Sequence, residues 1–132
     1  MDRMLLRRMV FYGYHGVIPE ENRLGQTFIV DLDLRLDLAP AGRTDDLSQT
    51  VNYADIHETI KAVVQGPPCR LIEALAEKIA TAVLTTYTSI NEATVAVTKP
   101  HPPFDIRFDG VTVEIRRRRD RDGNIVPVAE GG

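Results

Sequence analysis

The run from Phe28 to Leu38 alternates between apolar and charged residues. Its even positions are all apolar, and positions 31, 33, 35 and 37 are Asp, Asp, Arg and Asp. Because the side chains of a strand point alternately to its two faces, this period of two predicts a long strand with one buried face. No proline interrupts the run. We therefore expect an exposed sheet edge that closes against another copy of the chain.

A second strand is predicted just before this one. Residues 4–12 alternate less cleanly and run into Gly13 and Gly16, where we expect a bulge or a strained turn. The connection that follows, up to residue 27, is much longer than a two-residue hairpin turn, and such length usually serves a function. Residues 39–50 have turn chemistry and no periodicity, so we expect a loop there.

The spacing then becomes helical. Asn52 is a good N-cap for a first helix, which ends at Gly66 and the two prolines after it, where the second helix begins. The second helix has one broad apolar face, made of Leu71, Ile72, Leu75, Ala76, Ile79, Ala80 and Val83. Residues 93–99 and 110–116 read as two more strands. The order ββααββ predicts an α+β domain, with an antiparallel four-stranded sheet and two helices on one face.

Length and charge limit the class of protein. The 132 residues fit one domain, which we assign to residues 1–118, followed by a tail of residues 119–132. In this tail, the turn signal DGN favours either a short hairpin or a flexible end. The net charge of -3 argues against nucleic-acid binding, so the run Arg116 to Arg119 reads as a solvated strand end.

The cellular location is predicted from what the sequence lacks. No apolar run is long enough for a signal peptide or a membrane span. The single cysteine, Cys69, permits no internal disulfide and reads as a small buried or half-buried residue. We expect a cytoplasmic protein with no membrane partner.

Four residues could carry chemistry, and each has a plain structural alternative. Glu21 could be part of a solvated acidic pair, Lys99 a lysine at a strand end, and Tyr53 a packing aromatic. Glu73 is more informative. It lies about 160° from Leu75 around the second helix, at 100° per residue, so it faces away from the core of its own subunit.

Cofactor motifs are missing from the sequence. His15, His57 and His101 lack the spacing of a zinc site, so we expect no metal, and we expect His15 to fix its loop through hydrogen bonds. There is no glycine-rich phosphate loop and no serine nucleophile motif. We therefore expect no cofactor.

Five blocks together resemble the dihydroneopterin aldolase family of folate biosynthesis. In order, they are FYGYHGVIPEENRLGQTF with the following VDLDLRLDL, then AGRTDDLSQTVNY, RLIEALAEKIA, VTKPHPPF and GVTVEIRR. This resemblance implies the tunnelling fold, in which four subunits close their sheets into one oligomeric barrel and two such rings commonly stack as an octamer.

The resemblance also implies a reaction. 7,8-Dihydroneopterin would be cleaved to 6-hydroxymethyl-7,8-dihydropterin and glycolaldehyde, without a metal and without a Schiff base to lysine. The N5=C6 imine of the substrate can accept the electrons of the breaking carbon-carbon bond. The protein then needs only to orient the pterin and to move protons.

Roles follow from the resemblance, residue by residue. The catalytic residues would be Lys99, Tyr53 and Glu21, and the pterin would be bound by Glu21, Val51, Asn52, Tyr53, Ile72 and Glu73. The pocket would lie between subunits, with residues 51–53 on one wall and residues 72–73 on the other. A Glu21 carboxylate would keep the Lys99 ammonium charged. We therefore expect Lys99 to donate a proton near N5, and Tyr53 to protonate the enamine carbon or to relay that proton.

Two alternatives stay open at this point. Epimerisation of dihydroneopterin, or of its triphosphate, uses the same proton transfers. A non-catalytic oligomeric pterin-binding protein is the other alternative, in which Lys99 and Glu21 are only surface charges. The presence of Tyr53, Glu73 and Lys99 together argues against it.

Overall fold

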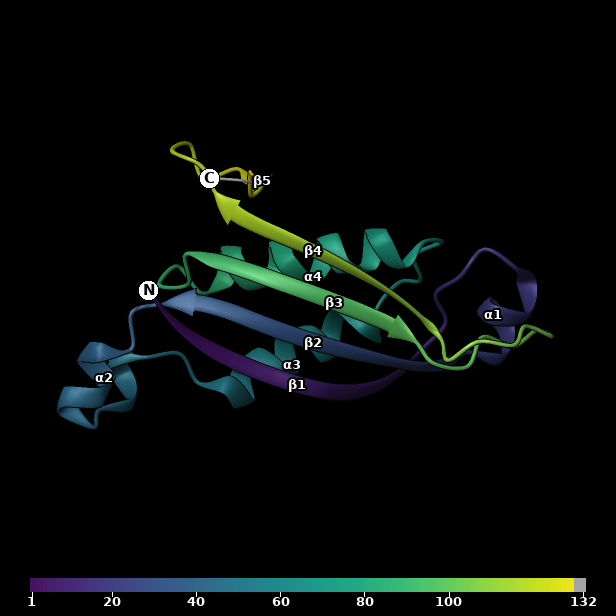
Figure 1. Cartoon of the computed structure of the whole chain (residues 1–132), viewed down its shortest axis with the longest axis horizontal. Helices are drawn as coiled ribbons and strands as arrows, with labels where there is room; N and C mark the ends of the chain where they lie inside the picture. Colours follow the sequence, from purple (N-terminus) through teal and green to yellow (C-terminus); the bar gives the residue numbers. More distant parts are fainter. Residues whose placement is uncertain (130–132) are drawn as a thin grey trace.

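The computed structural model describes residues 1–129, which form one antiparallel sheet with two long helices on one of its faces (Figure 1). The five strands are hydrogen-bonded in chain order. They are β1 (Asp2–Gly13), β2 (Gln26–Leu36), β3 (Glu92–Lys99), β4 (Val111–Arg119) and β5 (Ile125–Pro127). The helices on the sheet are α3 (Tyr53–Val64) and α4 (Ile72–Thr86). The predicted α+β class and the antiparallel sheet are confirmed.

Strand β2 has the buried face that its alternation predicts. Val30, Leu32, Leu34 and Leu36 are all buried, while the charged residues between them are partly exposed. The prediction that this strand is a sheet edge is wrong, because β2 pairs with β1 on one side and with β3 on the other. Alternation indicates which face of a strand is buried, but it carries no information on which strands pair with it. The sheet ends instead at β1 and at β4 with β5.

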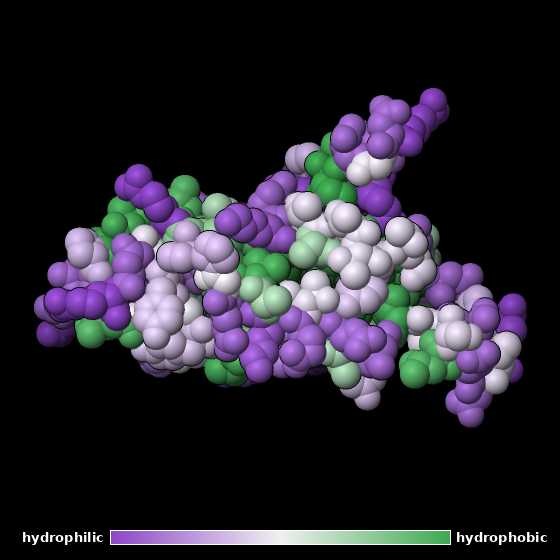
Figure 2. Space-filling model, turned by 180° about the vertical axis from the view of Figure 1, so that it is seen from behind, coloured by the Kyte–Doolittle hydropathy of each residue, from purple (hydrophilic) through white to green (hydrophobic). Residues whose placement is uncertain are grey.

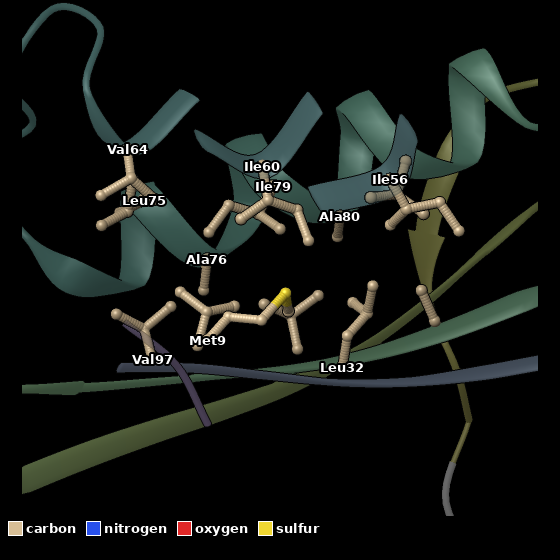
Figure 3. Packing of buried hydrophobic residues seen from close by; sticks show 14 of the residues in the cluster. Met9, Leu32, Ile56, Ile60, Val64, Leu75, Ala76, Ile79, Ala80 and Val97 are labelled. Carbon is tan, nitrogen blue, oxygen red and sulfur yellow. The ribbon is translucent and has the colours of Figure 1, made fainter. Parts of the chain in front are cut away.

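The core lies between the sheet and the helices (Figure 3). Helix α3 packs on β1, and α4 packs on β3, β4 and α3. Each helix buries a stripe at a spacing of three and four residues: Ile56, Ile60 and Val64 in α3, and Ile72, Leu75, Ala76, Ile79, Ala80, Val83 and Leu84 in α4. Burial of these stripes supplies most of the driving force that holds the helices on the sheet.

The helix starts differ from each other in how they are fixed. Asn52 caps α3 as predicted, since its side-chain oxygen accepts a hydrogen bond from the Ala54 N–H at 2.9 Å. Helix α4 begins at Ile72, later than the two prolines at which we expected it to start. Leu71 is the N-cap in extended conformation and is 50% exposed, so it is not part of the apolar face. Cys69 is buried, as expected.

One connection is more regular than the sequence predicted. Residues 39–50, expected to be a loop, contain the short helix α2 (Ala39–Thr44) and the 3-10 turn η1 (Leu47–Gln49). Asp45 ends α2 with a positive φ of 56°, and Asp46 caps η1 through Ser48 N–H. Of the two options predicted at the glycines after β1, the strained turn is confirmed, since Gly16 has φ 154°. The bulge of β1 lies elsewhere, between Leu6 and Met9, where Arg8 has φ 52°.

The tail forms a hairpin, the first of the two options that the sequence left open. Strand β5 pairs with Arg117–Arg119, so the sheet has a fifth strand where we predicted four. The Arg119 guanidinium donates to the carbonyls of Leu84, Thr88 and Ile90, which ties β4 to the end of α4. Residues 130–132 of the predicted tail lie outside the described residues. Seen from the helix side, the hairpin projects from the body of the molecule (Figure 2).

In the part of the chain that the structure describes, no helix is both long and apolar enough to cross a membrane.

Candidate functional site

A buried ion pair lies where the opening loop meets the end of β3. Glu21 comes from the short helix α1 (Pro19–Leu24), and Lys99 is the last residue of β3. The Lys99 Nζ lies 2.6 Å from Glu21 Oε2, and the two side chains are 13% and 4% exposed. A charge-assisted contact this short, shielded from water, is much stronger than a surface ion pair. The structural alternative for Glu21, a solvated acidic pair, is therefore wrong. Lys99 does stand at a strand end, but its side chain is mostly buried against Glu21 and does not extend into solvent.

A glycine and an asparagine of the loop position Glu21 beside Lys99. Gly16 has φ +154°, and a Cβ there would fall 2.3 Å from Glu21 Cδ, so only glycine fits against the carboxylate. Asn22 Nδ2 donates to the carbonyls of Tyr14 and Gly16, both at 3.0 Å, which fixes α1 on the loop. The length of the loop thus serves to place one carboxylate.

Gln26 is part of the site and was missed in the sequence. Its Nε2 donates to Glu21 Oε2 at 2.8 Å and to the His15 carbonyl at 3.4 Å, and the residue is 6% exposed. The same carboxylate oxygen therefore accepts from both Lys99 and Gln26. Position 26 has the same parity as the buried residues of β2. A polar residue at that position indicates a buried polar contact, and this could have been predicted from the sequence.

The surroundings hold Glu21 in its ionised form. Burial alone raises the pKa of the Glu21 carboxyl, but hydrogen bonds from Lys99 and Gln26, the charge of Lys99 and the Ile18 N–H together outweigh burial and lower the pKa. Glu21 is therefore a carboxylate at neutral pH. It can hold a water or a hydroxyl beside the Lys99 ammonium.

His15 fixes the loop, as the sequence predicted. The ring is fully buried, with Nδ1 2.8 Å from Cys69 N and Nε2 2.6 Å from Val64 O. Burial lowers the pKa of the ring below 6.5, the Val64 carbonyl opposes this, and the charges of Lys78 and Lys99 lower it further. His15 is therefore neutral at neutral pH.

Tyr53 lies apart from the ion pair. It opens α3 and is 67% exposed, next to Asn52, which caps the helix, and Val51, which is buried. It lines a cleft of about 670 Å³ between α3 and β1. The other lining residues are Met4, Leu5, Leu6, Arg7, Met9, Ala54, Asp55, His57 and Glu58.

Glu73 lies at the other end of the helical layer from Tyr53. It stands in the first turn of α4 and is exposed, while Ile72 beside it is buried. The prediction that Glu73 faces away from its own core is confirmed. Helix α4 begins next to the loop that carries Glu21, because Gly16 N–H donates to Cys69 O at 2.9 Å. The ends of α3 and α4 that carry Tyr53 and Glu73 are far apart in Figure 1.

The strand register gives a scale for this separation. Thr98, the residue before Lys99, pairs with Ile29 of β2, and Ile29 pairs with Val10 of β1, so Lys99 lies near the level of Val10 in the sheet. The cleft that Tyr53 lines begins further along β1, at Met4. At about 3.3 Å per residue, the Tyr53 cleft centres roughly 10–15 Å along the sheet from the level of Lys99. One chain therefore brings Lys99, Glu21 and the start of α4 to one end and places Tyr53 elsewhere.

Within residues 1–129, no group of three or more His, Cys, Asp or Glu side chains is arranged to hold a metal ion.

Comparison with known proteins gives consistent matches. A family model described as dihydroneopterin aldolase matches residues 4–116. The dihydroneopterin aldolase of Bacillus subtilis is 49% identical over 119 residues, which cover 90% of this chain and 99% of that protein. A putative dihydroneopterin aldolase from Vibrio cholerae has a TM-score of 0.83 at 26% identity, over 90% of this chain and 98% of that one. The E. coli enzyme in complex with neopterin has a TM-score of 0.81 at 27% identity, over 89% and 99%.

Proposed function

The chain belongs to the dihydroneopterin aldolase family, whose members cleave a carbon-carbon bond, and we propose that the buried Lys99–Glu21 pair carries this cleavage here. The substrate is 7,8-dihydroneopterin, and the products are 6-hydroxymethyl-7,8-dihydropterin and glycolaldehyde. A related enzyme binds neopterin in its crystal structure, which supports a pterin as the ligand.

Cleavage needs one proton removed and one proton supplied. The hydroxyl on the second side-chain carbon loses its proton and becomes the aldehyde of glycolaldehyde. The bond between the first and second side-chain carbons breaks, and its electron pair moves into the C6–N5 unit to give an enamine. Protonation of the first side-chain carbon then restores the imine. Electrons and protons balance without a metal or any other cofactor, because the ring itself is the electron sink.

Lys99 and Glu21 suit the first half of this reaction. The ammonium can donate a hydrogen bond to N5 as negative charge develops there, in a site where burial strengthens the interaction. Glu21, held ionised by Lys99 and Gln26, can hold in place the water that takes up the hydroxyl proton. Tyr53 supplies or relays the proton to the enamine carbon.

Substrate anchoring is assigned to Glu73. The pterin edge presents adjacent N–H donors, and the two oxygens of an exposed carboxylate can accept both at once. Ile72, and the backbone of Val51 and Asn52, complete the two walls of the pocket. Exposure of Glu73 on the side away from its own core leaves it free to meet a ligand.

Tyr53 reaches the substrate from a neighbouring subunit. Its distance along the sheet from Lys99 is too great for one small ligand to bridge within one chain, so the site is shared between two copies in a homo-oligomer. The oligomer is a barrel of four subunits, and two such barrels stack as an octamer. The proposed location is the cytoplasm.

The test is a product assay with a chelator present. The unmodified protein should form glycolaldehyde and 6-hydroxymethyl-7,8-dihydropterin from 7,8-dihydroneopterin, and Lys99→Ala should form neither at a comparable rate. An inverted side-chain hydroxyl in place of the two products would identify an epimerase. Tight pterin binding with no reaction would identify a binding protein, and either result refutes the proposal.

A further inference from the structure

We propose that His15 is a positioning residue, which holds the start of α4, and with it Glu73, in place relative to the Lys99–Glu21 pair. The inference rests on the proposed role of Glu73 as the pterin anchor. The His15 ring bonds to backbone atoms of Val64 and Cys69, and so acts through the connection before α4.

The ring has one possible tautomer in this setting. The Cys69 N–H points to Nδ1 at 2.8 Å, so Nδ1 must be the acceptor. The proton is then on Nε2, which donates to the Val64 carbonyl at 2.6 Å. Both ring nitrogens are used, and the ring has no exposed surface. A neutral ring in this tautomer joins the last residue of α3 to the connection before α4.

The main chain strengthens the same connection. Gly16 N–H donates to the Cys69 carbonyl at 2.9 Å, so residues 15–16 hold both the N–H and the C=O of Cys69. A Cβ at Gly13 would lie 3.0 Å from both the His15 ring and the Val64 carbonyl, so glycine leaves room for the ring. The position of Cys69 is therefore set by this loop.

Cys69 in turn sets where α4 begins. Two prolines stand before it, and only Arg70 and Leu71 separate it from Ile72, the first residue of the helix. Leu71 has no side-chain cap that would fix the helix start on its own. The two prolines restrict the chain, and the bonds from residues 15–16 fix Cys69. Together these constraints determine the position of Glu73, the residue after Ile72.

The same residue is linked to the ion pair. The His15 carbonyl accepts from Gln26 Nε2 at 3.4 Å, and Gln26 donates to the Glu21 carboxylate. The ring also packs edge-on against Phe28 of β2, with 5.2 Å between ring centroids. The main chain of His15 thus bonds to Gln26, which holds Glu21, and the ring of His15 bonds to Cys69, which fixes the start of the helix that carries Glu73. Because catalysis is sensitive to shifts of about 1 Å, this link bears on activity.

Two substitutions separate the two ring contacts. In His15→Asn, the amide oxygen can take the place of Nδ1 and accept from Cys69, but the bond to Val64 is lost. In His15→Gln, the amide nitrogen can reach the Val64 carbonyl, but the acceptor for Cys69 is lost. If the Cys69 contact positions Glu73, His15→Gln should weaken binding of 6-hydroxymethylpterin by about tenfold, and His15→Asn by less than about threefold. Fluorescence titration measures both.

Controls separate positioning from stability and from the proposed function. Arg119→Met loosens the opposite end of α4 by removing bonds to Leu84, Thr88 and Ile90, and should lower the Tm without changing pterin affinity. Glu73→Gln should weaken binding at least as much as His15→Gln. If Glu73→Gln has no effect, the assigned anchor is wrong. If Glu73→Gln weakens binding while both His15 variants bind normally, only the role of His15 is wrong.

One measurement needs no variant. The ¹⁵N chemical shifts of the His15 ring in the unmodified protein should show a neutral ring with the proton on Nε2, and the Cys69 amide should exchange its hydrogen more slowly than the Arg70 amide. A ring with its proton on Nδ1, or a fast-exchanging Cys69 amide, would overturn the inference even if neither His15 variant folds.

Discussion

Two inactive variants should restore activity to each other if the site is shared between copies. The first variant is Tyr53→Phe, which lacks the phenol, and the second is Lys99→Met, which lacks the ammonium but keeps an apolar chain of similar length. Each homo-oligomer should be inactive, because every site lacks one group. In a mixed oligomer, a Tyr53→Phe chain can supply Lys99 while its neighbour supplies Tyr53.

The expected recovery follows from the geometry. The Tyr53 cleft and Lys99 lie roughly 10–15 Å apart along the sheet of one chain, against a hydrogen-bond reach of about 3 Å. In the proposed oligomer, each site takes the two groups from different chains. With equal amounts of both chains, each partner is the correct one half of the time. About a quarter of the sites should be complete, so activity should reach about a quarter of the unmodified level.

The assay is glycolaldehyde formation after the two chains have been unfolded and refolded together. The matched control mixes Tyr53→Phe with the double variant Tyr53→Phe/Lys99→Met, which can form no complete site. Differently tagged chains and affinity capture confirm that mixed oligomers form. Mixed oligomers with no more activity than the control would refute a site shared in this way, and would require Tyr53 and Lys99 to act within one chain.

Three further predictions concern the loop and the ion pair. Lys99→Met leaves Glu21 buried without its cation and should lower the free energy of unfolding by about 3–5 kcal/mol, and adding Glu21→Gln should recover most of it in urea denaturation. Gly16→Ala should cost about 1–3 kcal/mol and reduce kcat, because its Cβ would overlap Glu21, whereas Gly42→Ala, in helix α2 with open space around it, should leave kcat unchanged and should not lower the stability. Since the pKa of Glu21 is lowered on folding from its ordinary value near 4.5, its contribution to stability is complete above that pH and is lost as the pH falls through the folded value. The urea midpoint of Glu21→Gln should fall less steeply with acid than that of the unmodified protein, and equal slopes would contradict the lowered pKa.

Hydrophobic periodicity was enough to predict most of the fold. The alternation of β2 and the stripe of α4 each record a buried face, and both faces are buried as expected. Periodicity carries no information on neighbours, which is why β2 was placed at an edge. Short elements such as α2 depend on caps and turns rather than on a repeating apolar pattern, so they were read as loop.

The site was harder to predict because burial of charge depends on contacts between distant segments. Glu21 and Lys99 are far apart in the sequence, and each alone has the composition of a surface residue. Only the resemblance to a family brought them together in advance. The alternation of β2 indicates that Gln26 is buried, but no pattern in the sequence predicts that its hydrogen-bond partner is Glu21.

The open edges of the sheet suggest how the two halves of the site meet. Tyr53 stands at the cleft beside the outer strand β1, and Lys99 pairs with Val111 at the beginning of β4. Within the described residues, β5 and Val128 cover the outer side of β4 only from Arg116 onward, so Val111–Ile115 stays available to another strand. In the proposed barrel, β1 of one copy pairs with this segment of the next. Closing a barrel requires strands to be staggered along their length. That stagger shifts one copy along its neighbour, and a shift of three or four residues is what Tyr53 needs to reach the level of Lys99.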